Sequence, residues 1–133
     1  MRRVVIDTNV IISAALNNTG NPSEILSLIS ERKIQMYCNA QILAEYATVL
    51  SRGKFKFSLE KQQRFLSRIQ QVSILIDPIL SNIPFLDESD RVFFDTAVIS
   101  DSILVTGNLK HYPKESFILS PLQYITMYNQ VRT

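Results

Sequence analysis

Acidic side chains at widely spaced positions are the residues of this sequence best suited to chemistry. Asp7 follows an apolar run, Glu45 falls among the apolar positions of an expected helix, and a later helix carries Asp90 and Asp95. A carboxylate removed from water needs a cation, a metal ion or hydrogen-bond donors around it. Convergence of several acids favours a hard divalent cation, Mg²⁺ or Mn²⁺, which takes oxygen ligands. Because such an ion activates water and neutralises a phosphoryl transition state, the pattern points to phosphodiester hydrolysis.

Each acid also has a purely structural interpretation. Glu45 could pair with a basic residue or reach solvent from the edge of its helix. Asp87, Glu88 and Asp90 could simply stabilise the dipole of the helix that they begin, and Asp95 could be an exposed helix charge. The single histidine and the single cysteine of the chain argue against a zinc site of the His/Cys type.

Basic residues concentrate in one segment of the chain. Residues 52–68 hold six cations and one acid, whereas residues 77–101 hold six acids and one cation, so a formal net charge of +2 conceals two opposite blocks. Clustered cations attract phosphates, and Phe55 and Phe57 could stack on bases. The alternative is a solvated helix face with both phenylalanines in the core. We predict that this segment binds RNA through Arg52, Lys54, Lys56, Lys61, Arg64 and Arg68.

Strands that alternate with helices must position these side chains. Apolar β-branched runs, polar caps and prolines at helix starts predict strands at 3–6, 34–38, 73–76, 103–106 and 117–119, and helices at 9–16 and from 21, 39, 58, 87 and 120. The alternation predicts one α/β domain over residues 1–133, with three α/β/α layers and a mostly parallel sheet of about five strands. Ligands gather at the carboxyl ends of such strands, where Asp7 and Thr106 lie.

Composition narrows the class of protein further. The chain has 133 residues, of which 46% are hydrophobic, and this excludes an extended disordered chain. It contains no apolar run of about 18 residues, so we expect no membrane span. The opening Met1-Arg2-Arg3 leads too soon into a charged residue for a signal peptide, which makes the cytoplasm the expected location. Three scattered glycines do not form a phosphate-binding loop.

Taken in order, these motifs resemble the PIN-domain family. The resemblance covers nearly the whole chain and rests on Val-Val-Ile-Asp7-Thr8-Asn9-Val, Glu45 in a helix, Asp87-x-x-Asp90-x-x-Phe93-Phe94-Asp95-x-Ala97 and Leu-Val-Thr106-Gly107-Asn108. The sequence is most similar to prokaryotic PIN-domain toxins of toxin–antitoxin pairs. This resemblance implies a Mg²⁺- or Mn²⁺-dependent endoribonuclease with a compact α/β fold. It also implies a homodimer and a cognate antitoxin that blocks the site.

The resemblance also implies roles for individual residues. The three core acids, which hold the metal and take part in catalysis, match Asp7, Glu45 and Asp90. Asp95 matches a position that is often acidic in this branch, and it could serve a second metal or the attacking water. Asn108 stands where many members have a further Asp, and its amide oxygen can coordinate a metal without adding charge. Three polar neighbours are expected to orient these groups: Thr8, Asn9 and Thr106.

Three other functions are compatible with parts of the pattern. A catalytically weak or silent PIN module that binds RNA or a protein partner is favoured by the neutral Asn108. A receiver-like phosphotransfer domain with Asp7 as nucleophile would need a second acid beside it and a lysine after a late strand, and the sequence has neither. A 5′-nuclease acting on DNA flaps uses related acids but normally has a longer chain. Metal-dependent RNA cleavage is therefore the primary prediction.

Overall fold

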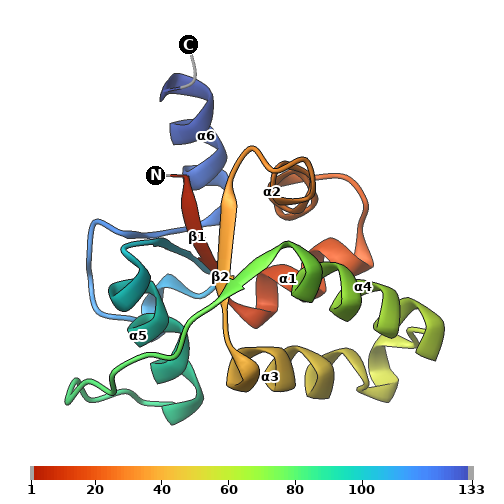
Figure 1. Ribbon diagram of the computed structural model, residues 1–133, viewed down its shortest axis with the longest axis horizontal. Helices are drawn as coiled ribbons and strands as arrows, with labels where there is room; N and C mark the ends of the chain where they lie inside the picture. The colour runs from red at the N-terminus through yellow and green to blue at the C-terminus, as the bar shows by residue number, and fades with distance from the viewer. Residues whose placement is uncertain (1, 132–133) are drawn as a thin grey trace.

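A computed structural model describes residues 2–131. They form a five-stranded, fully parallel sheet and the helices that cover it (Figure 1). The strands are β1 (Arg3–Ile6), β2 (Gln35–Cys38), β3 (Ser73–Leu75), β4 (Ile103–Val105) and β5 (Ile118–Leu119). The helices are α1 (Thr8–Leu16), α2 (Asn21–Ser30), α3 (Ala40–Leu50), α4 (Leu59–Val72), α5 (Arg91–Ser100) and α6 (Pro121–Val131). Three short 3₁₀ turns complete the order: η1 (Gly53–Phe55), η2 (Glu88–Asp90) and η3 (Leu109–His111).

The strand order β3-β2-β1-β4-β5 puts β1 at the centre of the sheet. The chain first builds outward from β1 through β2 to β3, and then returns to add β4 and β5 on the other side. Val4 in β1 pairs with Met36 in β2 and with Ile103 in β4. Because central parallel strands are covered on both faces, β1 is a continuous apolar run, and its residues Val4, Val5 and Ile6 are fully buried.

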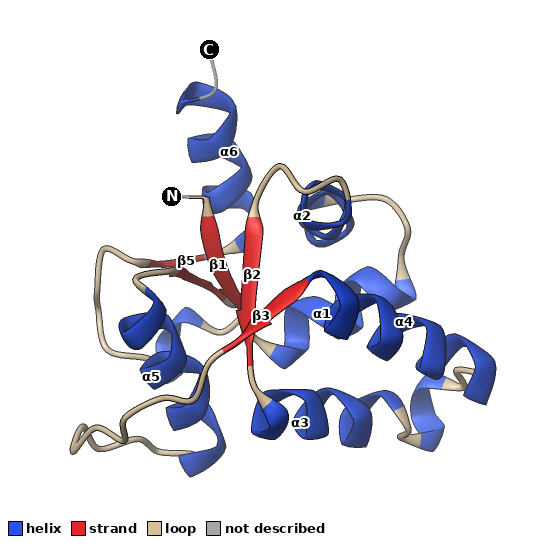
Figure 2. Ribbon diagram, in the orientation of Figure 1, coloured by secondary structure: helices blue, strands red, loops and turns tan. Residues whose placement is uncertain are grey.

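Helices cover both faces of this sheet, which confirms the predicted three-layer architecture. In Figure 2, α5 lies on one side of β1 and β2, and α1, α2 and α4 lie on the other. One large apolar cluster fills both interfaces, and a smaller cluster of Ile12, Ala15, Val49 and Leu50 joins α1 to α3. Within the described residues, no helix has both the length and the apolar character that a membrane span requires.

Local sequence signals set most of the element boundaries. The Asn39 side chain caps α3 by accepting a hydrogen bond from the backbone N–H of Ile42 (2.9 Å), and Ser58 caps α4 in the same way. The helix predicted from residue 21 starts there, but its cap is Gly20, whose φ of +104° suits glycine. The helix predicted from residue 87 opens with the 3₁₀ turn η2 before α5 begins.

Candidate active site

Asp7 lies where β1 ends and α1 begins, and its carboxylate is held by several donors. The side chain is only 6% exposed. Its Oδ1 accepts a hydrogen bond from the Thr8 backbone N–H (2.8 Å). Its Oδ2 accepts from the Thr106 hydroxyl (2.8 Å), the Tyr112 hydroxyl (3.0 Å) and the Asn9 amide (3.4 Å). The donors therefore crowd Oδ2 and leave Oδ1 as the oxygen with free capacity for a further ligand.

Burial works against the charge on Asp7. It raises the pKa of the Asp7 carboxyl above its ordinary value, and the hydrogen bonds from Thr106 and Tyr112 oppose that rise. Burial also raises the pKa of Tyr112, and the nearby Asp7 and Asp90 raise it further. The Tyr112 hydroxyl consequently keeps its proton at neutral pH and serves as a donor to Asp7.

The topology explains why Asp7 and Thr106 meet. The chain changes direction across the sheet between β1 and β4, and in open parallel sheets ligands bind in the crevice beyond the carboxyl ends of such a pair of strands. The Thr106–Asp7 hydrogen bond crosses this switch point. Gly107 follows directly, and its N–H donates to Asn9 Oδ1 (2.8 Å). A Cβ on Gly107 would lie 3.1 Å from that oxygen, so the close approach favours glycine.

The opposite wall of the site comes from α3, which is anchored at two points. The Tyr46 hydroxyl donates to the carbonyl of Ile6, the last residue of β1, and Tyr46 is fully buried. The Asn39 amide at the start of the helix donates to Thr96 Oγ1 in α5 (2.9 Å). These contacts fix α3 against the sheet edge and hold Glu45, the neighbour of Tyr46, at the same opening as Asp7.

Four carboxylates line one pocket of about 490 Å³ at this edge of the sheet: Asp7, Glu45, Asp87 and Asp90. We call it the acid pocket. The structure also places the predicted Thr8, Asn9 and Asn108 in its wall, whereas Thr106 acts from behind through Asp7. Five segments of the chain thus line a single opening: the junction of β1 and α1, helix α3, turn η1, turn η2 with the start of α5, and the loop after β4.

Repulsion among these acids is visible at Asp90. Burial, followed by the charges of Asp7 and Asp87, raises the pKa of Asp90 from 3.8 to about 6, and Glu45 adds to the rise. His111 opposes it, with Nδ1 lying 3.5 Å from Asp90 Oδ2. The carboxylates therefore outweigh the local cations, and a bound positive charge would relieve the imbalance.

The donor set fits a divalent cation that keeps part of its water shell. The Thr8 hydroxyl is buried in the pocket wall and is the one buried side-chain polar atom of the described residues without a hydrogen-bond partner. Within residues 2–131, no three His, Cys, Asp or Glu side chains are arranged to enclose a metal by themselves. Mg²⁺ typically takes one or two carboxylates and several waters, so it does not need such a cage. Cys38 is buried and burial raises its pKa to about 12, which does not suit a zinc thiolate.

Asp95, predicted as a further catalytic and metal-binding acid, lies outside the acid pocket. It is buried, at 3% exposure, and its Oδ2 accepts a hydrogen bond from the Ser81 backbone N–H (2.9 Å). Five residues along a helix turn the side chain by about 140° beyond a full rotation, so Asp95 does not follow Asp90 toward the pocket. Its role in the structure is to secure the long segment between β3 and α5.

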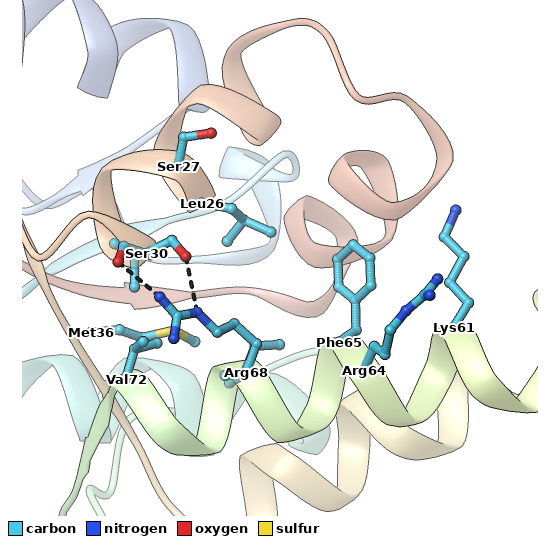
Figure 3. A pocket seen from close by; sticks show the side chains of 11 residues that line it. Leu26, Ser27, Ser30, Met36, Lys61, Arg64, Phe65, Arg68 and Val72 are labelled. Atoms are coloured by element: carbon cyan, nitrogen blue, oxygen red, sulfur yellow. Dashed lines mark hydrogen bonds between the residues drawn. The ribbon is translucent and has the colours of Figure 1, made fainter.

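The predicted RNA-binding cations divide into two groups. Arg52 lines the acid pocket, and Lys54 and Lys56 are exposed on the adjoining chain. Lys61, Arg64 and Arg68 instead border a second pocket, of about 380 Å³, between α2 and α4 (Figure 3).

The three cations at the second pocket make contacts within the chain. Arg68 donates to the hydroxyl and the carbonyl oxygen of Ser30 (both 2.9 Å), as the dashed lines in Figure 3 show. Lys61 donates to the Ala15 carbonyl (2.7 Å), and Arg64 pairs with Glu60 (3.2 Å). The basic stripe of α4 therefore lines a different pocket from the acids and is partly committed to contacts within the fold.

Three residues that contribute to the site could not be predicted from the sequence. Asp87 looks like an ordinary first-turn acid, and His111 looks like a surface loop residue, yet both line the acid pocket. Tyr112 follows a short polar loop and is buried against Asp7 through an interaction that spans 105 positions. A single tyrosine carries no local signal for such a contact. Tyr112 reaches Asp7 because β1 and β4 are neighbours in the sheet.

Comparison with known proteins agrees with this arrangement. The family model of the PIN domain matches residues 3–110. An uncharacterized protein of Methanocaldococcus jannaschii is 38% identical over 109 residues, which are 80% of this chain and 70% of that protein. PIN domains are in general nucleases, and hence hydrolases, that use divalent metal ions. The matched region contains every carboxylate of the acid pocket, and the chain belongs to the PIN-domain family.

Proposed function

We propose that this protein is an endoribonuclease that hydrolyses RNA phosphodiester bonds at the acid pocket with Mg²⁺ or Mn²⁺. One observation carries the proposal: carboxylates from separate segments face one opening beside a buried hydroxyl that has no partner in the described chain. Asp7, Glu45 and Asp90 are the proposed metal-holding and catalytic acids. Asn108 is a proposed neutral ligand, and Asp95 is left out because it lies elsewhere.

In this proposal, the residues around the pocket have different roles. Thr106 and Tyr112 fix Asp7 Oδ2, so the carboxylate keeps a constant orientation in which Oδ1 would be available to the ion. In the metal-free protein the pKa of Asp90 is about 6, so below that pH a proton would compete with the ion for this carboxylate. The ion, when bound, supplies charge stabilisation at the phosphoryl group and lowers the pKa of a water molecule.

The test combines a binding measurement with a cleavage measurement. Calorimetric titration with Mn²⁺ should show saturable binding to the wild type, and a labelled single-stranded RNA should be cut only with the metal present. Asp7→Asn should keep the fold and lose RNA cleavage by more than about 100-fold. Asp77→Asn is the matched control, because Asp77 is exposed and outside the pocket. Cleavage retained by carefully purified Asp7→Asn would remove Asp7 from the mechanism.

A catalytically silent RNA- or protein-binding module is the second candidate. The neutral Asn108 and the displacement of Asp95 favour it, because both leave the pocket with fewer negative ligands than the resemblance implied. The same Mn²⁺ titration separates the two functions. Saturable Mn²⁺ binding accompanied by cleavage supports the enzyme, whereas the absence of both supports the silent module.

We also propose a biological setting, which rests on the resemblance to PIN-domain toxins. In this setting the protein is the cytoplasmic toxin of a toxin–antitoxin pair, acts as a homodimer, and is inhibited by an antitoxin that blocks the acid pocket. Growth arrest on expression, relieved by the product of an adjacent small open reading frame, is the expected result. Light scattering on the purified chain tests the dimer. Unimpaired growth during expression of active enzyme would instead favour a role in RNA processing.

A further inference from the structure

The acid pocket is not lined by carboxylates alone. Phe55, in turn η1, lines it together with the apolar side chains of Ile12 and Val49. Arg52 lines it as well. Within residues 2–131 the Arg52 guanidinium forms no hydrogen bond or ion pair, although acids line the same pocket. These residues therefore add an aromatic ring, an apolar wall and an uncommitted cation to the pocket.

The ring of Phe55 packs against another aromatic ring of the chain. It stacks nearly parallel on Phe57, with ring centroids 5.7 Å apart and an interplanar angle of 17°. Phe57 does not line the pocket, and it packs with Phe55 against the small apolar cluster of α1 and α3. Lys61 lies over the Phe57 ring at 4.9 Å and donates to the Ala15 carbonyl, which ties this pair to α1. Phe55 thus already has a stacking partner before any ligand binds, and both rings pack against the small apolar cluster between α1 and α3, so less ordering entropy opposes stacking on Phe55.

The combination matches the chemistry of an unpaired nucleotide. Nucleobases stack on aromatic side chains in a manner that tolerates any sequence, and arginine binds the neighbouring phosphate. Lys54 is exposed and its Nζ lies over the Phe55 ring, 5.1 Å from the centroid, so a base that stacks on Phe55 would displace this ammonium and keep its positive charge close by. A base inside a duplex is already stacked and cannot present its face, so such a subsite selects single-stranded or looped substrate.

We propose that Phe55 and Arg52 form the subsite for an unpaired nucleotide next to the phosphodiester at the acid pocket, with Phe55 stacking on the base and Arg52 binding its phosphate. This inference rests on the proposed function, because it names the form of RNA that the pocket accepts. It also assigns different roles to the two groups of cations: Arg52 contacts the substrate, whereas the α4 stripe does not.

The test measures binding without cleavage. Single-stranded RNA hexamers that carry 2-aminopurine at successive positions are titrated with the full chain in EDTA at low salt. Quenching at one position is expected with the wild type, and a hairpin stem of the same sequence should give none. Phe55→Leu should raise the Kd about tenfold, near the lower end of measured base–aromatic stacking, and should abolish the quenching. Phe55→Trp should retain both.

Two further variants make the outcome specific. Phe65→Leu makes the same change at a partly buried phenylalanine of the other pocket, and its Kd should stay within about twofold of the wild type. Arg52→Gln should weaken binding and reduce the slope of log K against log salt by about 0.7, the value for one phosphate contact on a single strand. Equal losses in Phe55→Leu and Phe65→Leu, unchanged quenching in Phe55→Leu, or no binding by the wild type would each overturn the subsite.

These outcomes are separable from failure of the proposed function. If Phe55-dependent quenching is observed but no metal-dependent cleavage is found, the nuclease proposal fails and the subsite stands. If the wild type cleaves RNA and Phe55→Leu binds and cleaves like the wild type, the subsite fails and the nuclease proposal stands.

Discussion

Replacement of Asp90 by Asn should make the metal-free protein more stable at neutral pH, although it removes a proposed metal ligand. The pKa of Asp90 is raised from 3.8 to about 6, chiefly by burial and then by the charges of Asp7 and Asp87. A raised pKa means that the folded state holds the proton more tightly than the unfolded state does. The ionised carboxylate therefore destabilises the fold, and this effect develops as the pH rises from about 4 to about 6.

The magnitude follows from the size of the rise. At about 1.4 kcal/mol per pKa unit, a change from 3.8 to about 6 corresponds to about 3 kcal/mol. The pocket is open to water, which screens the interaction, so we expect about 1–2 kcal/mol. Asp90→Asn should thus match the wild type near pH 4 and exceed its free energy of unfolding by about 1–2 kcal/mol above pH 7.

Urea denaturation in EDTA across pH 4–8 measures this difference directly. Asp77→Asn, at an exposed position outside the pocket, is the control and should change the free energy of unfolding by less than about 0.5 kcal/mol. Saturating Mg²⁺ should then stabilise the wild type by about 2.7 kcal/mol at one hundred times its Kd, and the variant by less. A difference that does not vary with pH, or a variant less stable than the wild type at pH 7, would refute the electrostatic reasoning.

Two further substitutions test how the carboxylates are held. Tyr112→Phe removes a donor from Asp7 and should lower the free energy of unfolding by about 1–2 kcal/mol at pH 8, with a smaller loss near pH 4 where Asp7 takes up a proton; urea denaturation at the two pH values checks this. Asp95→Asn keeps an acceptor for the Ser81 N–H and should leave the rate of metal-dependent RNA cleavage within about twofold of the wild type, whereas a loss comparable with that of Asp7→Asn would return Asp95 to the active site.

Local signals predicted most of the fold because each is satisfied where it occurs. The apolar run 3–6 forms the central strand, and Asn39 and Ser58 cap the helices that follow them. Short strands and helix first turns are less determined by local sequence. The strand predicted at 117–119 is reduced to Ile118–Leu119, which are the residues with register partners in β4, and the Phe117 carbonyl still accepts a hydrogen bond from the Leu104 N–H (2.8 Å).

The candidate site was predictable where it depends on strand ends and not where it depends on side-chain direction. Asp7 directly follows β1, so its position at the sheet edge needs only the strand assignment. The direction of the Asp95 side chain depends on the rotation of α5 about its axis, and that rotation depends on how Phe93 and Phe94 pack in the core. The contacts of the α4 cations could not be predicted either, because their partners Ser30 and Ala15 lie 38 and 46 positions away in the sequence.

The order of the strands explains why we propose the chemistry at the acid pocket and not between α2 and α4. Both pockets are lined by ionisable groups, but only the acid pocket lies beyond the carboxyl ends of β1 and β4, where the direction of sheet building reverses. There the chains leaving two neighbouring strands diverge, so loop residues such as Tyr112 and Asn108 can converge on Asp7. The sequence contains the acids but not the adjacency of β1 and β4, and this adjacency converts scattered carboxylates into one site.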